Sequence, residues 1–167
     1  MTFAVIIEPL SPAHDRDDFT CGVSALDRYL REQAGQDVRR RVANCFVALE
    51  HETGAIAGYY TLAASSIAVA ELPITETRRL PRYPVLPATL IGRLAVDNRY
   101  RGRQLGVTLV ADAVRRTARA EPAAFTLLVD AKDDTAAAFY KKLGFVPLAS
   151  RPLTLFLPVA TALKLFS

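Results

Sequence analysis

The stretch RYRGRQLG at residues 99 to 106 contains the residue types that bind anions. It lies between LIGRLAVD, which is nearly all apolar, and VTLVADAVRRT, whose apolar residues recur at helical spacing. The first backbone N–H groups of a helix have no partner within the helix, and with the helix dipole they attract negative charge. Arg101 and Arg103 add positive charge. The sequence therefore predicts a strand, a basic loop and a helix that bind a phosphate-bearing ligand.

Two common nucleotide-binding patterns are absent from this stretch. A P-loop needs G-x-x-x-x-G-K-[ST], but Gly102 and Gly106 are too close together and no Lys-Ser or Lys-Thr follows. The dinucleotide pattern G-x-G-x-x-G is also absent, since Gln104 stands where a second glycine is expected. We therefore expect a cofactor that carries a pyrophosphate but is not a nucleoside triphosphate. For the loop to work, we expect Gln104 to be helical, as in the first turn of the following helix.

Tyr140 is the candidate residue for proton transfer. It lies in DDTAAAFYKKLGF, which predicts a short helix with Asp133 or Asp134 as N-cap and Gly144 just after its end. A phenol can donate a proton to a leaving group on which negative charge develops. The alternative is that Tyr140 is only a core residue, because it shares helical spacing with apolar neighbours. We expect Phe139 to be the better core residue, and the Tyr140 hydroxyl to need a partner if buried.

Composition and charge indicate a single globular domain, which we expect to span residues 1–167. The chain is 51% hydrophobic and 23% charged, which is ordinary for a soluble protein. Its formal net charge of +4 does not by itself imply nucleic acid. Seven arginines and only two acids lie between Arg93 and Arg119. Codon usage in a GC-rich genome explains the arginine total better, whereas phosphate contact explains the cluster better.

Metal-binding, membrane and secreted classes are disfavoured. Cys21, Cys45, His14 and His51 lack metal-ligand spacing. The longest uncharged stretch is too short to span a membrane, and the N-terminus lacks a basic leader. We therefore expect a cytoplasmic protein with no metal.

The elements that position these residues follow from hydrophobic periodicity and turn residues. We expect a helix over 19–37, strands over 44–50 and 54–69 joined by a hairpin turn, an irregular segment over 71–88, a strand over 88–97, a helix over 104–120, a strand over 123–130, a helix over 133–145 and closing strand material over 145–159. In the helix over 104–120 we expect a buried stripe of Val107, Val110, Ala111, Val114 and Ala118. We expect its other face to hold Asp112, Arg115, Arg116 and Arg119.

Two stretches of the sequence resemble motifs of a known enzyme family. IGRLAVDNRYRGRQLG is similar to motif A of the GNAT acetyltransferases, in which a strand and a Q/R-x-x-G-x-G/A loop hold acetyl-CoA. Arg101 matches the first position and Gly106 the last, whereas Gln104 departs at the central glycine. AAAFYKKLGF resembles motif B. The resemblance implies an α/β GNAT fold, with a central, mixed, mostly antiparallel twisted sheet flanked by helices.

The resemblance also implies the site residues. Acetyl-CoA would lie along the edge of the strand at Leu94, Ala95 and Val96, whose side chains are otherwise plain core. Its pyrophosphate would be wrapped by the backbone amides of Arg101, Gly102, Arg103, Gln104, Leu105 and Gly106, for which the alternative is a solvated loop. Tyr140 would be the general acid. No spacing singles out a general base among Asp97, Glu50 and His51.

Three further pieces, FTCGVSALDRYL, GYYTLA and GRLAVD, resemble GNAT toxins of bacterial type II toxin–antitoxin systems. That resemblance implies acetylation of the amino group of aminoacyl-tRNA and a block of translation. It also implies a homodimer, a ribbon–helix–helix antitoxin, and DNA contact only through the antitoxin complex. Candidate arginines for the tRNA phosphates are Arg39, Arg40, Arg41, Arg78, Arg79, Arg82 and Arg93, of which we favour Arg40, Arg78, Arg79 and Arg93.

Arg93 stands within an apolar strand, so we expect it to have either an acidic partner or a functional ligand. Two rival functions stay open. One is a GNAT enzyme that acetylates a protein N-terminus, a lysine or a small amine. The other is a non-catalytic module that senses acetyl-CoA or binds the antitoxin and DNA.

Overall fold

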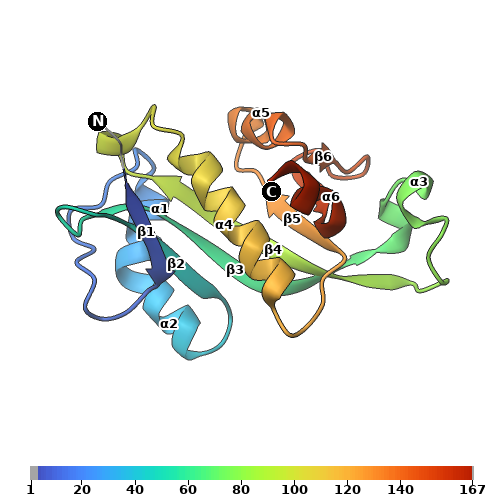
Figure 1. Cartoon of the computed structure of the whole chain (residues 1–167), viewed down its shortest axis with the longest axis horizontal. Coiled ribbons are helices and arrows are strands. Elements are labelled where there is room, and N and C mark those ends of the chain that lie inside the picture. The colour runs from blue at the N-terminus through green and yellow to red at the C-terminus, as the bar shows by residue number, and fades with distance from the viewer. Residues whose placement is uncertain (1–3, 167) are drawn as a thin grey trace. The chain divides into compact units, whose positions relative to one another are not determined.

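The structure is a computed structural model that describes residues 4–166, and the chain forms two compact units. One unit is built from the residues up to Ala63 together with Gly92–Asp112, and the other from Ala64–Ile91 and the residues from Ala113 onwards. Along the chain the elements are β1 (Val5–Pro9), α1 (Ser24–Arg28), the π-helical turn η1 (Tyr29–Gln33), α2 (Ala34–Arg39), β2 (Asn44–Glu50), β3 (Ile56–Ala68), the 3-10 turn η2 (Val69–Glu71), α3 (Ile74–Thr77), β4 (Val85–Val96), the 3-10 turn η3 (Asn98–Tyr100), α4 (Leu105–Arg119), β5 (Thr126–Asp130), α5 (Asp134–Lys142), β6 (Val146–Pro147), β7 (Thr154–Pro158) and α6 (Val159–Leu165) (Figure 1).

The strands form one mixed sheet in the hydrogen-bonded order β1-β2-β3-β4-β5-β7-β6. The β4–β5 pair is parallel, whereas the β1–β2, β2–β3, β5–β7 and β6–β7 pairs are antiparallel. The expected α/β fold, with a mixed and mostly antiparallel sheet and flanking helices, is therefore confirmed. The predicted hairpin between β2 and β3 is also present, and it is closed by a hydrogen bond from the Gly54 amide to the Glu50 carbonyl.

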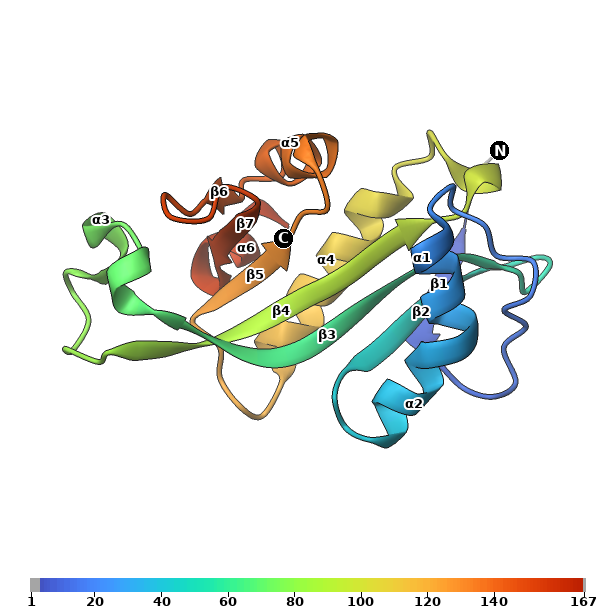
Figure 2. The same ribbon diagram turned by 180° about the vertical axis from the view of Figure 1, so that it is seen from behind.

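In the first unit, two neighbouring tyrosines of β3 anchor helices to opposite faces of the strand. Tyr59 and Tyr60 are both fully buried, and successive side chains of a strand point to opposite sides. The Tyr59 hydroxyl donates to the Leu26 carbonyl of α1 at 2.7 Å. The Tyr60 hydroxyl donates to the Asp112 carboxylate of α4 at 2.5 Å. The strand is thereby held between α1 and the first half of α4 (Figure 2).

The N-terminal helical segment begins later than the periodicity predicts. The expected helix over 19–37 starts only at Ser24 and continues through η1 and α2 to Arg39. The buried carboxylate of Asp27 accepts hydrogen bonds from the Cys21 amide and the Thr20 hydroxyl. These bonds keep the preceding residues in a loop, because their polar groups are satisfied without a further helical turn.

The buried face of α4 differs in part from the predicted stripe. Val110 and Val114 are buried as expected, whereas Ala118 is exposed. The other fully buried apolar residues of the helix are Leu105, Leu109 and Ala113. Asp112 was expected on the solvated face but is buried, because the Tyr60 hydroxyl donates to its carboxylate. A buried hydrogen-bond partner has thus overridden the polarity pattern.

The second unit has its own apolar core, which includes Ile67, Leu72, Leu86, Ala88, Leu128, Leu148 and Phe156. The predicted start and end of α5 are confirmed there. Asp133 is the N-cap, and its carboxylate accepts the Ala136 amide at 2.8 Å. Gly144 follows the helix with φ at +107°, the left-handed conformation expected of a residue just beyond a helix end.

Several features of the fold were not predicted from the sequence, among them the short helix α3 within the segment expected to be irregular. The structure adds the edge strand β1 and the final helix α6. It also starts β4 at Val85, inside the segment expected to be irregular, and the strand runs through Pro87. Pro87 has no N–H to offer, but its carbonyl accepts the Phe125 amide at 2.9 Å, so the strand keeps that contact. Within the described residues, no helix combines the length and apolarity needed to cross a membrane.

We predict that Tyr59→Phe lowers the free energy of unfolding by about 1 kcal/mol, because the hydrogen bond from the Tyr59 hydroxyl to the Leu26 carbonyl is lost. Urea denaturation of the two proteins measures the difference. Tyr83→Phe is the matched control, since the Tyr83 side chain is 56% exposed, and it should stay within about 0.5 kcal/mol of the parent. Equal midpoints for the two variants would contradict a role of the Tyr59 hydroxyl.

Candidate functional site

The predicted anion-binding loop leaves β4 through η3 and enters α4 (Figure 2). Its first four residues, 101 to 104, are exposed, whereas Leu105 is buried and fixes the start of the helix. The Thr108 amide donates to the Gln104 carbonyl at 3.1 Å, which is the first turn of α4. The amides of residues 105 to 107 therefore precede the helical hydrogen bonds. A helix start of this kind can bind an anion through its amides and its dipole.

Gln104 is not helical, so that prediction is wrong. Its φ is +57°, in the left-handed region, and Gly102 has a φ of +76°. The left-handed conformation costs an L-residue roughly 1–2 kcal/mol, whereas glycine adopts it freely. The chain therefore lacks the central glycine of motif A but retains the backbone conformation that a glycine would favour at this position.

The two arginines of the loop contact other parts of the protein. The Arg101 guanidinium donates to the Cys21 carbonyl at 2.6 Å and so ties the start of the loop to the segment before α1. The Arg103 guanidinium lies 5.9 Å from the ring centre of Tyr100. The Tyr100 hydroxyl in turn donates to the Glu50 carboxylate at the end of β2. These contacts fix the shape of the loop through its arginine side chains and do not use its backbone amides.

The end of β4 holds the three residues expected to lie along the cofactor. Ala95 is buried, and Leu94 and Val96 are half-buried. The register of β4 with β5 covers Ala88 to Ile91, so these three residues lie beyond it. On the β3 side the approach is close, because a Cβ atom added to Gly58 would lie 2.9 Å from the Ala95 carbonyl. Their role in holding the pantetheine arm stays a prediction.

A buried carboxylate fixes the turn between β4 and the loop. Asp97 is fully buried and accepts hydrogen bonds from the Thr20 amide, the Arg99 amide and two guanidinium nitrogens of Arg99, at 2.9 to 3.1 Å. Burial by itself would raise the pKa of Asp97, but the hydrogen bonds from Arg99 and Thr20 outweigh it, and the pKa is lowered. Arg99 was not among the site residues expected from the sequence. The signal for it is the Asp-x-Arg spacing, since an aspartate commonly accepts from residue i+2.

None of the three candidate general bases is singled out by the geometry. Both Asp97 oxygens are engaged by Arg99 and Thr20, so Asp97 is a structural residue. The Glu50 carboxylate accepts from the Tyr100 and Thr53 hydroxyls. His51 is exposed in the turn that follows β2.

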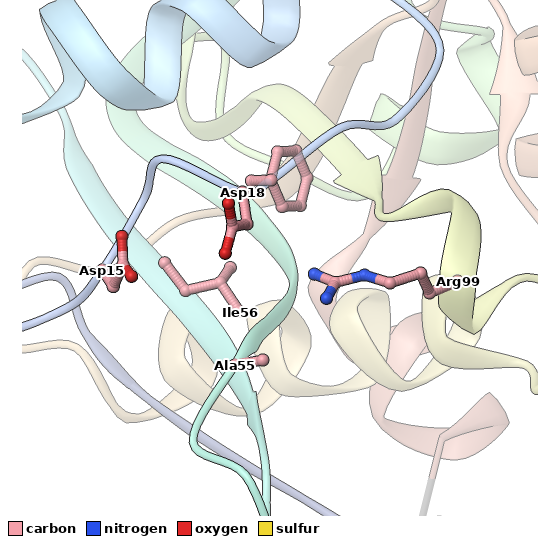
Figure 3. A pocket seen from close by; sticks show the side chains of 6 residues that line it. Asp15, Asp18, Ala55, Ile56 and Arg99 are labelled. Carbon is pink, nitrogen blue, oxygen red and sulfur yellow. The ribbon is translucent and has the colours of Figure 1, made fainter.

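A small cavity of about 50 Å³ lies beside the Asp97–Arg99 pair (Figure 3). Asp15 and Asp18 enter it from the segment after β1, and the Arg99 guanidinium faces it from η3 (Figure 3). The volume suits a few ordered waters and is far below the several hundred Å³ of a cofactor pocket. We therefore regard it as part of the support of the loop.

Tyr140, the predicted proton donor, lies on the buried side of α5, whereas Phe139 is only half-buried. The expectation that Phe139 is the better core residue is therefore wrong. The Tyr140 ring meets Phe139 and Phe145 edge to face, with centroids 5.1 and 5.5 Å away. Burial raises the pKa of Tyr140 above its ordinary value of 10.0, which keeps the phenol protonated at neutral pH.

The Tyr140 hydroxyl has no hydrogen-bond partner among the described residues. The other buried tyrosines are paired, with Tyr29 bound to Asp37, Tyr59 to Leu26, Tyr60 to Asp112 and Tyr100 to Glu50. A buried phenol normally finds a partner. Tyr140 thus has the protonation state and the unused donor that a general acid requires.

The arginines expected to contact tRNA are all exposed. In the first unit these are Arg39, Arg40, Arg41 and Arg93, and in the second unit Arg78, Arg79 and Arg82. Arg93 is exposed rather than buried in the strand, and of its two expected partners the functional ligand stays a prediction. Its guanidinium carbon lies 3.7 Å from the ring centre of Tyr29, and within the described part of the chain no carboxylate forms an ion pair with it.

Comparison with known proteins identifies a family and several relatives that are similar to this chain. Residues 41–147 match the model of the acetyltransferase (GNAT) domain. The chain is 32% identical over 166 residues to a probable toxin TacT of Sinorhizobium fredii, covering 93% of this chain and 92% of that protein. It is 37% identical over 150 residues to a tRNA-acetylating toxin of Mycobacterium tuberculosis, covering 89% and 88%.

Several solved structures of toxins are similar to this chain over nearly its whole length. AtaT in complex with acetyl-methionyl-tRNAfMet has a TM-score of 0.89 at 30% identity, covering 98% of this chain and 100% of that one. AtaTR bound with acetyl-CoA has a TM-score of 0.82 at 30% identity, with 98% of each chain covered. A tyrosine-to-phenylalanine mutant of AtaT bound to the C-terminus of the antitoxin AtaR has a TM-score of 0.82 at 29% identity, again with 98% of each covered.

We predict that Asp97→Asn lowers stability at pH 7 by about 2 kcal/mol, because buried donors lose their charged acceptor. Since folding lowers the pKa of Asp97, its stabilising contribution is complete above the unfolded value of about 3.9 and is lost as pH falls through the folded pKa. The difference between variant and parent should therefore shrink below about pH 4. Urea midpoints at pH 7, 5 and 3 measure it. A difference that is the same at all three pH values would refute the assignment.

We also predict that Gln104→Gly leaves acetyl-CoA affinity within about twofold of the parent and stability within about 1 kcal/mol, because glycine adopts the observed left-handed φ. Gln104→Val should weaken both, since a β-branched residue is strained at positive φ. Isothermal titration calorimetry with acetyl-CoA and urea denaturation check the pair. Equal behaviour of the two variants would mean that this φ is not needed.

Proposed function

The chain belongs to the GNAT acetyltransferase family, within the group of toxins that holds TacT and AtaT, and from this premise we propose that it transfers an acetyl group from acetyl-CoA to the α-amino group of aminoacyl-tRNA. Acetylation of that amine blocks its use in translation, which makes the protein a toxin. The observation that carries the proposal is the similarity over nearly the whole chain to AtaT in complex with acetyl-methionyl-tRNAfMet.

Acetyl-CoA is bound by the loop and by the end of β4 in this proposal. The backbone amides of residues 101 to 106 hold the pyrophosphate, with the start of α4 supplying the unpaired N–H groups. The backbone of Leu94, Ala95 and Val96 binds the pantetheine arm as an added strand would. AtaTR has been solved with acetyl-CoA, which supports the same donor for this chain.

The reaction needs few catalytic groups. The amine nitrogen attacks the thioester carbonyl carbon, a C–N bond forms, the C–S bond breaks, and CoA leaves as a thiolate. Tyr140 donates its proton to that sulfur. The amine loses its own proton to water, and water returns a proton to Tyr140. Loss of the amine proton is feasible because an α-amino group titrates near pH 7.7–8.0, roughly 2.5 units below a lysine. A dedicated general base is therefore not required.

The state of the Tyr140 side chain supports this role. Its buried phenol stays protonated at neutral pH, so a proton is present when the thiolate forms. Its hydroxyl has no partner among the described residues, so donation to sulfur breaks no existing hydrogen bond with a described residue.

The partners follow from the same proposal. The exposed Arg40 in one unit and Arg78 and Arg79 in the other contact tRNA phosphates, and the exposed Arg93 also contacts tRNA. We propose a cytoplasmic homodimer that is neutralised by a ribbon–helix–helix antitoxin and meets DNA only in the antitoxin complex. The similarity to AtaT bound to the C-terminus of AtaR supports an antitoxin partner.

We predict that Tyr140→Phe lowers kcat by about 10²–10³-fold and leaves the KM for acetyl-CoA unchanged, because only the departing thiolate loses its proton donor. Acetylation of aminoacyl-tRNA in vitro, with a scan of charged tRNAs, measures this. Expression in cells should arrest growth with the parent protein and not with the variant. Tyr83→Phe serves as the control that keeps parental activity.

Other results would contradict the proposal. Wild-type rates with Tyr140→Phe would show that another group supplies the proton. Acetylation of protein N-termini, lysines or small amines with unmodified tRNA would show a GNAT enzyme of another substrate class. Binding of acetyl-CoA without any transfer would show a non-catalytic module.

A further inference from the structure

A second and larger cavity lies in the first unit, between the N-terminal helical segment and β4. Its volume is about 310 Å³, and its walls include Leu26, Arg28, Tyr29, Glu32, Gln33 and Arg93. Pockets that bind small ligands or parts of larger ones begin at about this size. Neither the loop between β4 and α4 nor Tyr140 lines this cavity, so the proposed acetyl transfer gives the cavity no role.

A column of stacked side chains ends at this cavity. The Phe19 ring meets the Tyr59 ring edge to face, and Tyr59 stacks on Tyr29 with an angle of 16° between the rings. The Arg93 guanidinium lies over Tyr29, 3.7 Å from its centre. Phe19, Tyr29 and Tyr59 are all buried, whereas Arg93 is exposed. The guanidinium is thus the accessible last member of a buried aromatic column.

The Tyr29 ring, on which the Arg93 guanidinium stacks, is held in place by several hydrogen bonds around it. The Tyr29 hydroxyl donates to the Asp37 carboxylate at 2.7 Å, and the Gln33 side chain donates to its other oxygen at 2.9 Å. Tyr29 and Gln33 belong to the π-helical turn η1, a rare conformation that occurs frequently at functional sites. The Arg16 guanidinium donates to the Leu30 carbonyl of that turn at 3.2 Å. These contacts fix the plane against which Arg93 stacks.

A guanidinium that forms no ion pair with a described carboxylate, and that lies over an aromatic ring, matches the way proteins bind single-stranded RNA. Unstacked bases pack on aromatic rings and on arginine planes, whereas duplex regions are contacted mainly at their phosphates. The geometry favours a base, because the Arg93 guanidinium lies over the Tyr29 ring and so offers a planar face for stacking. In the same wall the charges of Arg28 and Glu32 offset each other.

We propose that this cavity receives an unpaired nucleobase of the single-stranded 3′ end of tRNA, stacked on Arg93, with Tyr29 and Asp37 as positioning residues. The inference rests on the proposed function, since it names the part of tRNA that this site binds. It assigns to Arg93 a planar contact rather than the phosphate contact of the other exposed arginines. Arginine and lysine differ in a planar contact, because lysine keeps the charge but cannot stack.

The test measures the binding of an uncharged tRNA and of the same tRNA trimmed of its single-stranded 3′ nucleotides. The parent protein should bind the intact tRNA about tenfold more tightly, as one stacked base allows. Arg93→Lys should bring this ratio close to one and leave the affinity for trimmed tRNA unchanged. Arg31→Lys is the matched control, because Arg31 is exposed on the same turn and does not line the cavity, and it should keep the parental ratio.

The positioning residues are tested by kinetics. Both Asp37→Asn and Tyr29→Phe keep the shape of the column, but the first weakens the hydrogen bond between these residues and the second removes it. Both should raise the KM for aminoacyl-tRNA by about three- to tenfold, while kcat and the KM for acetyl-CoA stay unchanged. A residue with only a structural role would lower the thermal midpoint without this selective change.

Three outcomes would overturn the inference. If Arg93→Lys binds intact tRNA as tightly as the parent does, charge is sufficient and the contact is to a phosphate. If it weakens intact and trimmed tRNA equally, Arg93 contacts the duplex. If the parent protein acetylates aminoacyl-tRNA but binds trimmed tRNA as well as intact tRNA, this inference fails and the proposed function stands. If the parent protein neither binds nor acetylates tRNA, the proposed function itself is wrong.

Discussion

The geometry of the loop between β4 and α4 depends on one buried carboxylate. Asp97 stands where β4 ends, and its oxygens accept hydrogen bonds from the segment before α1 and from both the backbone and the side chain of Arg99. A charge at this depth is destabilising by several kcal/mol unless all of its partners are in place. The end of β4, the turn η3 and the segment before α1 therefore adopt their positions together. Their positions in turn fix where the loop to α4 begins.

The parts of the fold that the sequence predicts well are those determined by neighbours along the chain. The Asp133 cap and Gly144 fix the ends of α5 within one short segment. The hairpin between β2 and β3 is determined by its turn residues in the same way. The motif A and motif B residues are also contiguous, and for that reason the sequence alone indicates the family.

The parts that the sequence did not predict are decided by residues far apart in the chain. Asp112 looks like a surface residue on its helix, but its partner Tyr60 lies 52 positions earlier. Arg93 looks buried within an apolar strand, but it is exposed and stacks on Tyr29. The backbone of Gln104 follows from the path that the loop must take between η3 and α4, and the residue type gives no sign of it.

The hydrogen bonds from Arg101 to Cys21 and from Thr20 to Asp97 also bear on how the chain folds. They join residues 80 and 77 positions apart, and closing such long loops is entropically unfavourable before other contacts form. Contacts of this separation tend to slow folding and to form cooperatively. The ribosome makes the segment around Cys21 first, so it must remain available until the loop emerges. In a nascent chain these two hydrogen bonds can consequently form only after the residues through Arg101 have been synthesised.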